Sequence, residues 1–190
     1  MITISAVILA GGLARRMGGV EKGLQLLHHQ PLIAQVLARL KSQVNAISIN
    51  ANRHLAEYEQ FGVPVFPDEM ADFQGPLSGM LTSLRRATTD YVLFVPCDCP
   101  YLPLNLAEKL KSAVENSAVL CAYAHDGERD HPTFSLISRQ LFTALEQYLA
   151  NGERRIFTFL REQGAVSVDF SEQKNAFRNF NTLADLQEQS

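Results

Sequence analysis

The chain begins with an apolar, β-branched run that stops abruptly at a pair of glycines. Residues 7–9 (Val-Ile-Leu) lead into Ala-Gly-Gly at 10–12, and a short loop follows with Arg15, Arg16, a second glycine pair and Lys22. Glycine lets backbone N–H groups turn toward an anion without a Cβ in the way. Arginine and lysine add positive charge for phosphate oxygens. The pattern predicts a β-strand that runs directly into a phosphate-binding loop.

Two common phosphate-binding motifs do not fit this loop. A Walker loop needs Ser or Thr directly after its lysine, but Gly23 follows Lys22 here. The dinucleotide fingerprint G-x-G-x-x-G is absent because the glycines come as adjacent pairs. The loop therefore indicates another class of nucleotide-binding protein.

The size and composition predict one ordinary globular domain. The chain has 190 residues, of which 46% are hydrophobic and 19% charged, enough for a substantial core. The net charge of −3 argues against a generic nucleic-acid surface, and no apolar run approaches a membrane span. Three cysteines favour a reduced, cytoplasmic compartment. We expect Cys97 and Cys99 to be small buried residues rather than a zinc site.

Apolar runs alternate with helical patterns along most of the chain. Strands are predicted at 2–9, 46–50, 63–66, 91–95, 118–122, 133–137 and 166–170, and helices at 31–43, 55–61, 75–86, 104–116, 138–149, 154–163 and 182–189. Such alternation favours a right-handed series of βαβ units. We therefore expect a three-layer, Rossmann-like α/β sandwich, with a mostly parallel central sheet and a small antiparallel portion at 133–137.

Glycine or polar residues follow four of the predicted strands. Gly11 follows the first strand, Asn50 ends the second, Asp68 follows the third, and Asp98 follows the strand at 91–95. In open α/β sheets, ligands bind at the carboxyl ends of the strands. These residues are therefore expected to converge on one site.

The pattern L-A-G-G-x-x-x-R-M-G-x-x-x-K at 9–22 resembles that of nucleotidyltransferases that activate sugars, alcohols and pterins. Within that superfamily, the chain is similar to the molybdenum cofactor guanylyltransferases over nearly its whole length. Residues 125–133 (H-D-G-E-R-D-H-P-T) and 179–181 (N-F-N) narrow the resemblance to this branch. Further matching blocks lie at 50–53, 67–68, 75–79, 96–100 and 152–155.

The resemblance implies a single nucleotidyltransferase domain over residues 1–190, in which about 1–103 bind GTP and about 104–190 bind the acceptor. The implied reaction transfers GMP from GTP to the terminal phosphate of molybdopterin, bare or carrying molybdenum, and releases pyrophosphate. The implied cofactor is Mg²⁺, for which Mn²⁺ can substitute. The candidate partners are a GTP-binding accessory protein and a molybdenum-insertion enzyme.

Candidate residues for GTP lie in the first half of the chain. Arg16 and Lys22 are expected to hold the triphosphate, and Asp98 to hold Mg²⁺, which typically takes one or two carboxylates plus phosphate oxygens. Asp68, with Asn50 beside it, is expected to read guanine, since a carboxylate accepts from both N1–H and N2–H₂. Turn-forming roles for Asp and Asn, and a solvated role for lysine, stay open. The resemblance assigns nucleotide contacts to Leu9, Ala10, Gly11, Gly12, Lys22, Asn50, Asp68 and Asp98.

Candidate residues for the acceptor lie near 154 and near the C-terminus. Arg154 and Arg155 begin a predicted helix, where basic residues oppose the helix dipole and suggest a nearby anion. Asn179 and Asn181 alternate with Phe180, so on a strand both amides would share one face and Phe180 would face the core. The resemblance assigns pterin recognition to this pair. An Asn181→Asp change is therefore expected to weaken pterin binding and spare GTP binding.

Three alternatives stay open on the sequence. A cytidylyltransferase for the same pterin would differ in base preference, and a sugar-phosphate nucleotidyltransferase would differ in acceptor, although 190 residues is short for the latter. A non-catalytic nucleotide-binding adaptor would show no metal-dependent release of pyrophosphate. Hydrolase triads are not indicated, because none of the five histidines has a matching nucleophile context.

Overall fold

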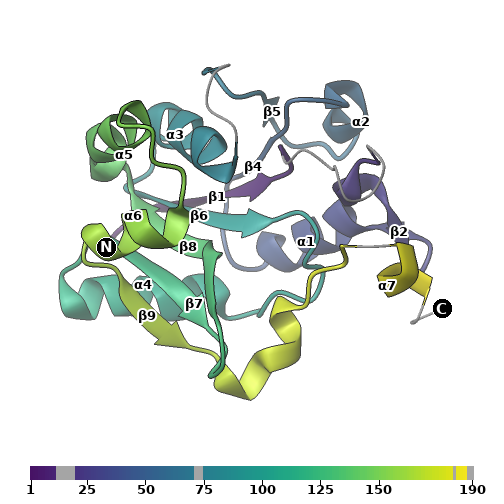
Figure 1. The fold of residues 1–190 in the computed structure, drawn as a ribbon. Helices are drawn as coiled ribbons and strands as arrows, with labels where there is room; N and C mark the ends of the chain where they lie inside the picture. Colours follow the sequence, from purple (N-terminus) through teal and green to yellow (C-terminus); the bar gives the residue numbers. More distant parts are fainter. Residues whose placement is uncertain (12–19, 71–74, 182, 188–190) are drawn as a thin grey trace.

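A seven-stranded sheet forms the centre of the molecule in the computed structural model, which describes residues 1–11, 20–70, 75–181 and 183–187 (Figure 1). Its strands are β1 (Ile4–Leu9), β4 (Ile47–Asn50), β5 (Val65–Phe66), β6 (Tyr91–Pro96), β7 (Cys121–His125), β8 (Asp130–Ser138) and β9 (Val166–Asp169). A separate small hairpin consists of β2 (Leu26–Leu27) and β3 (Gln30–Pro31).

The strand order in the large sheet is β5-β4-β1-β6-β8-β7-β9. The first four of these are mutually parallel, and β9 is parallel to β7. β8 runs antiparallel to both β6 and β7. The expected mostly parallel sheet with a small antiparallel portion is therefore confirmed, and β8 contains the segment predicted to run in the opposite sense.

Helices cover both faces of the sheet, which gives the expected three layers (Figure 1). On one face lie α1 (Leu32–Lys41) and α4 (Leu106–Ser117), with α2 (Leu55–Glu59) packed into the same buried cluster. On the other face lie α3 (Pro76–Arg86), α5 (Phe142–Ala150) and α6 (Ile156–Glu162). The remaining helical segments are η2 (Lys22–Leu24), η3 (Arg139–Leu141), η4 (Ser171–Phe177) and α7 (Leu183–Gln187). None of the described helices combines the length and apolarity that a bilayer span requires.

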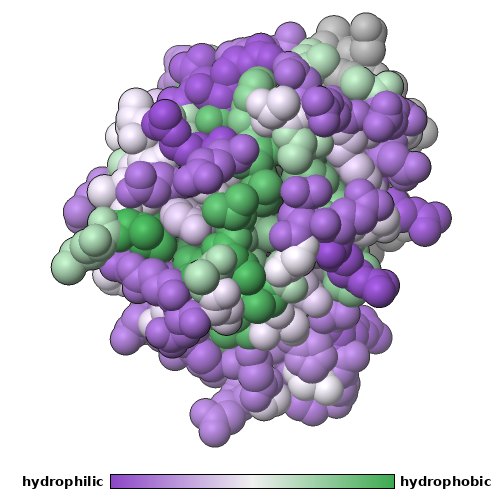
Figure 2. Space-filling view, turned by 90° about the vertical axis from the view of Figure 1, so that its left-hand side faces the viewer, coloured by the Kyte–Doolittle hydropathy of each residue, from purple (hydrophilic) through white to green (hydrophobic). Residues whose placement is uncertain are grey.

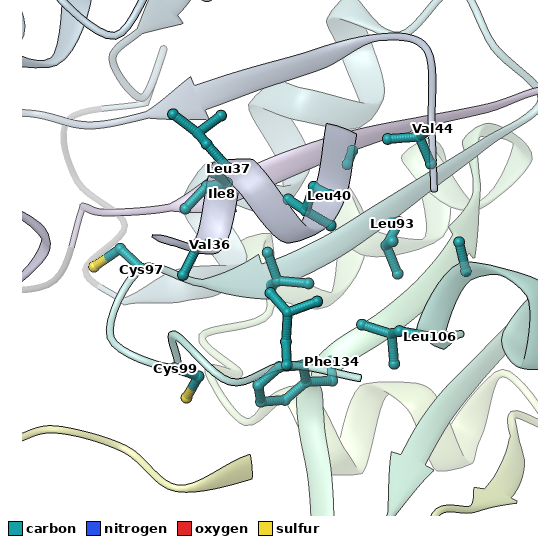
Figure 3. Close-up of a cluster of buried hydrophobic side chains, with 14 of the residues drawn as sticks. Ile8, Val36, Leu37, Leu40, Val44, Leu93, Cys97, Cys99, Leu106 and Phe134 are labelled. Carbon is teal, nitrogen blue, oxygen red and sulfur yellow. The ribbon is translucent and has the colours of Figure 1, made fainter. Parts of the chain in front are cut away.

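Alternate residues of the buried strands contribute to two hydrophobic clusters, one on each face of the sheet. Ile8 and Leu93 belong to the cluster under α1 and α4, whereas Val7 and Phe94 belong to the cluster under α3, α5 and α6. Figure 3 shows Ile8 beside the α1 side chains in the first cluster. Neighbouring residues of a strand face opposite sides of the sheet, so strands that are apolar at every position need helices on both faces.

Some predicted element boundaries are wrong, for local reasons. The strand predicted from 118 begins at Cys121, because Ala118 caps α4 in the left-handed conformation with φ 52°. The helix predicted from 138 is divided into η3 and α5. Residues 179–181 form no strand, although the Phe180 N–H still donates to the Asp98 carbonyl at 3.0 Å.

A pocket of about 670 Å³, lined by both apolar and polar residues, lies at the amino ends of the strands. Met1, Ile2, Ile4, Val44 and Leu104 are among the residues that line it. The pocket lies beside the N-terminus, on the side of the molecule shown in Figure 2, where hydrophobic side chains form a band between hydrophilic ones. The predicted ligand site lies at the opposite edge of the sheet.

Candidate active site

The carboxyl ends of three parallel strands meet where β1 ends. Leu9 of β1 is the register partner of Asn50 in β4 and of Pro96 in β6. The Ala10 N–H donates to the Asn50 carbonyl at 2.8 Å, and the Cys97 N–H donates to the Leu9 carbonyl at 3.2 Å. The polar segments that follow these strands therefore start from one small region.

Asp68 lies between two asparagine side chains. Asn50 Nδ2 donates to Asp68 Oδ1 at 2.8 Å, and Asn52 Nδ2 donates to Asp68 Oδ2 at 3.2 Å. The Asp68 N–H donates back to Asn52 Oδ1 at 2.8 Å. These bonds fix the plane of the carboxylate, and each oxygen keeps a lone pair for a further donor. Asn52 belongs to the sequence block at 50–53, but no sequence pattern marks it separately as a site residue.

A pocket of about 190 Å³ opens beside this carboxylate. Thr133 of β8 lines it as well, so the antiparallel part of the sheet also reaches the pocket. A Cβ on Gly79 would lie 2.1 Å from Asn50 Oδ1, and one on Gly11 would lie 3.1 Å from Asn52 Nδ2. Glycine at 79 is therefore required for Asn50 to take this position, and a side chain at 11 would crowd Asn52. The lining residues are Leu9, Gly11, Asn50, Asp68, Gly75, Pro76, Pro96 and Thr133.

Lys22 lies between Asp98 and Asn181. Its Nζ is 3.5 Å from Asp98 Oδ2 and donates to Asn181 Oδ1 at 2.9 Å. Asp98 follows β6 and is only 7% exposed, so the neighbouring ammonium offsets the cost of burying its carboxylate. This arrangement brings three of the predicted site residues together.

Cys99 orients the other predicted asparagine. Its thiol donates to Asn179 Oδ1 at 2.7 Å. Burial raises the pKa of the Cys99 thiol well above its usual value, which keeps the thiol protonated as a donor. Asn179 is exposed, Asn181 is partly exposed and Phe180 is buried, so the predicted alternation holds without a strand. Sequence reasoning treated Cys99 only as a small buried residue and missed this contact.

Of the remaining predicted residues, only the arginines at 154 and 155 lie in the described part of the chain. Gly12, Arg15 and Arg16 lie outside the described residues. Arg155 is exposed at the start of α6, and its carbonyl accepts from the Tyr148 hydroxyl at 3.0 Å. In the described part of the chain, no hydrogen bond joins the Arg155 side chain to the asparagines of the cluster.

The surroundings of Asp98 fit a magnesium ion that takes most of its ligands from a phosphate substrate. Mg²⁺ prefers oxygen and is usually bound through one or two carboxylates, phosphate oxygens and water. The Asp98 carboxylate and the Asn181 amide oxygen supply that chemistry. Over the described residues there is no group of three or more His, Cys, Asp and Glu side chains that could hold a metal alone.

Comparisons with known proteins identify the family. Residues 6–166 match the model of the MobA-like NTP transferase domain. The molybdenum cofactor guanylyltransferase of Mannheimia succiniciproducens is 68% identical over 185 residues, which cover 97% of each chain. The corresponding protein of Haemophilus influenzae is 59% identical, with 97% of this chain and 96% of that one covered.

Solved structures show the same fold. The crystal structure of molybdopterin-guanine dinucleotide biosynthesis protein A from Archaeoglobus fulgidus has a TM-score of 0.80 at 20% identity and covers 97% of this chain and 96% of that one. The fold, the glycine-rich start of the chain and the sequence identities agree, and the chain belongs to the molybdenum cofactor guanylyltransferases of the MobA-like NTP transferase family.

Proposed function

We propose that this protein transfers GMP from GTP to the terminal phosphate of molybdopterin, bare or carrying molybdenum, and releases pyrophosphate. The observation that carries the proposal is the position of Lys22 beside buried Asp98, at the same sheet edge as the Asp68 pocket. The Asp68 carboxylate at this edge offers hydrogen-bond acceptors for a base, and Lys22 offers positive charge for a triphosphate. The guanylyltransferase relatives support the choice of guanine and pterin.

Base recognition is assigned to Asp68. Guanine presents N1–H and N2–H₂ as neighbouring donors, and a carboxylate accepts from both. Asn50 and Asn52 already hold the Asp68 carboxylate from the sides, so it is preorganised for a base. Cytosine lacks this donor pair, which favours GTP over CTP.

Transfer of the nucleotidyl group needs positioning more than acid–base chemistry. An oxygen of the acceptor phosphate attacks the α-phosphorus of GTP, and the bond from that phosphorus to the bridging β-oxygen breaks. Pyrophosphate leaves with the electron pair. A phosphate monoester is already a nucleophile, so no general base is required. Lys22, with Arg16, offsets charge on the triphosphate and on the leaving pyrophosphate.

Asp98 is the residue proposed to hold Mg²⁺, or Mn²⁺ in its place. When bound, the ion would neutralise charge between the two phosphate substrates. Lys22, which lies 3.5 Å from the same carboxylate, would contact the triphosphate. The mutual repulsion of two anions is thereby reduced by two separate positive charges.

Recognition of the pterin is assigned to Asn179 and Asn181, with Arg155 as a candidate for its phosphate. Because the Cys99 thiol occupies Asn179 Oδ1, the two N–H donors of that amide are directed elsewhere and are available to a ligand. On this proposal residues 1–103 contribute mainly to GTP binding and residues 104–190 mainly to acceptor binding. A GTP-binding accessory protein and a molybdenum-insertion enzyme remain the proposed partners.

Thermal stability measured with ATP, GTP, CTP and UTP, each with and without Mg²⁺, tests nucleotide choice. A ligand that binds only the folded state adds about 2.7 kcal/mol at a hundredfold excess over its Kd. We expect stabilisation by GTP. Stabilisation by CTP would favour a cytidylyltransferase, and no response to any nucleotide would contradict the proposal.

Pyrophosphate release with GTP and molybdopterin then tests catalysis. We expect release that depends on both the pterin and the metal. A protein that binds GTP but releases no pyrophosphate would be a nucleotide-binding adaptor. Release with a sugar phosphate in place of the pterin would instead indicate a sugar-phosphate nucleotidyltransferase.

A further inference from the structure

A buried carboxylate lies next to the lysine of the site. Glu21 precedes Lys22 and is only 8% exposed. Its Oε1 accepts from the Tyr58 hydroxyl at 2.8 Å, and its Oε2 lies 3.6 Å from Arg53 Nη2. Burying a carboxylate is costly unless it is paired. Packing alone would favour an apolar residue here, so the acid suggests a role tied to its neighbours.

The backbone of Glu21 is held as firmly as its side chain. Its carbonyl accepts from the Leu24 N–H at 3.3 Å and from Gln25 Nε2 at 3.1 Å. Glu21 itself is extended, with φ −74° and ψ 111°, and Lys22 begins η2 directly after it. The Glu21 side chain is buried against Tyr58. The side chain of the next residue, Lys22, instead reaches Asp98 and Asn181 in the site.

Tyr58 leaves little freedom for this segment to move. The residue is completely buried in α2. A Cβ on Gly23 would lie 2.7 Å from the Tyr58 hydroxyl and 3.3 Å from Cys97 Cβ. The tyrosine ring thus packs directly against the residue that follows Lys22. Burial raises the pKa of Tyr58 far above its usual value, so the hydroxyl remains a hydrogen-bond donor to Glu21.

Arg53 connects the same carboxylate to the base pocket. It follows Asn52, whose side chain bonds to Asp68. The ion pair between Arg53 and Glu21 therefore links the segment that reads the base with the segment that carries Lys22. Arg53 is itself 44% exposed, so this link is weaker than the buried bond from Tyr58.

We propose that Glu21 is a positioning residue that, held by Tyr58 and Arg53, fixes Lys22 for a nucleoside triphosphate. Glu21 touches no substrate and acts only through Lys22. The inference rests on the proposed function, in which Lys22 binds the triphosphate of GTP. If Glu21 acts in this way, its replacement has no further effect once Lys22 has been removed.

The test is a double-mutant cycle on the affinity for GTP with Mg²⁺, measured by calorimetry without the acceptor. We expect Glu21→Gln and Tyr58→Phe each to weaken GTP binding about five- to tenfold. Combined with Lys22→Ala, neither change should weaken binding further. The matched control is Tyr91→Phe, because the Tyr91 hydroxyl also donates a hydrogen bond, to the Val119 carbonyl at 3.1 Å, but at the amino end of β6. This control should leave the affinity within about twofold.

Wild-type affinity in the Tyr58→Phe and Glu21→Gln variants would overturn the inference. The same loss with and without Lys22 would also overturn it, because a merely structural role is additive. If the Glu21→Gln variant does not fold, the affinity of the Tyr58→Phe variant for GTP tests the inference alone. If the wild type prefers CTP, guanylyl transfer is contradicted but this inference is not. The double-mutant cycle is then measured with CTP in place of GTP. A wild type that binds no triphosphate overturns both.

Discussion

Lys22 donates a hydrogen bond of 2.9 Å to Asn181, a residue 159 positions further along the chain. The lysine is proposed to hold the triphosphate, and the asparagine is proposed to contact the pterin. The two substrate sites therefore share one hydrogen bond in the free protein. A triphosphate that binds the Lys22 ammonium competes with Asn181 for it. Binding of GTP therefore changes which hydrogen-bonding groups Asn181 offers to the pterin.

Replacing Lys22 by alanine should lower both GTP affinity and kcat. A hydrogen bond to a charged group contributes about 1.5–3 kcal/mol, which corresponds to roughly a 10- to 100-fold lower kcat/KM. Steady-state pyrophosphate release at varied GTP measures both parameters. The control is Lys41→Ala, an exposed lysine at the end of α1. Unchanged GTP affinity would remove Lys22 from the triphosphate site.

Asn181→Asp should weaken GTP binding as well as pterin binding. From the sequence, Asn181 is a pterin contact only, and its change is expected to spare GTP. The hydrogen bond to Lys22 alters that expectation, because a second carboxylate beside Asp98 would hold the ammonium more strongly. We expect GTP affinity to fall about three- to tenfold. Calorimetry with GTP alone measures this, and an unchanged Kd would restore the sequence-based expectation.

Asp98→Asn should lower kcat much more than it changes the affinity for GTP. The amide keeps the shape of the side chain but loses the negative charge proposed to hold Mg²⁺. Loss of a preorganised charge in the transition state typically costs about 100-fold or more in kcat. The measurement is pyrophosphate release over a Mg²⁺ titration, in which a raised metal requirement is expected. Full turnover by the variant would contradict the metal assignment.

Asp68→Asn should reduce selectivity for guanine. The amide presents one acceptor instead of two, so a base donor loses its partner, which costs about 1–3 kcal/mol. Inosine triphosphate, which lacks the N2–H₂ group, provides a matched ligand. It should bind the wild type more weakly than GTP, and the difference should shrink in the variant. Asp90→Asn, at the amino end of β6 and bonded to Thr3, is the control.

The sheet could be predicted from the sequence because its strands are mostly apolar, most clearly in β6. The run at 91–95 has no charge and is buried in β6 from Val92 to Val95, and its burial on both faces requires the three layers that are observed. The boundaries that differ depend on single-residue conformations. Ala118 takes a left-handed φ of 52° with no glycine to signal it, and His28 and His29 do the same in the unpredicted β2–β3 hairpin.

The part of the site that strand positions alone could predict is the set of polar residues at the strand ends. Asn50, Asp68 and Asp98 follow the parallel strands, so the topology alone brings them to one edge. The contacts that hold them depend on residues distant in sequence. The Cys99–Asn179 and Glu21–Tyr58 bonds join positions 80 and 37 apart, respectively, and no local pattern marks such pairs.

Acidification should selectively loosen the turn that joins β7 and β8. Asp126 accepts from the N–H groups of Glu128 and Arg129 and from His131 Nε2, the last at 2.7 Å. The His131 ring stacks on Phe177 at 4.6 Å between ring centres, just before Asn179. Although burial acts to raise it, these hydrogen bonds hold the pKa of Asp126 well below its usual range.

The direction of the pH effect follows from this lowered pKa. An unfolded aspartate titrates near pH 3.9, so the stabilisation is complete above about pH 5 and is lost as the pH falls toward the folded-state pKa. Asp126→Asn should therefore lower the melting temperature at pH 7, and its difference from the wild type should shrink between about pH 5 and pH 3. Glu172→Gln, an exposed acid in η4, is the control. A difference that stays constant over this range would show that the Asp126 charge does not stabilise the turn.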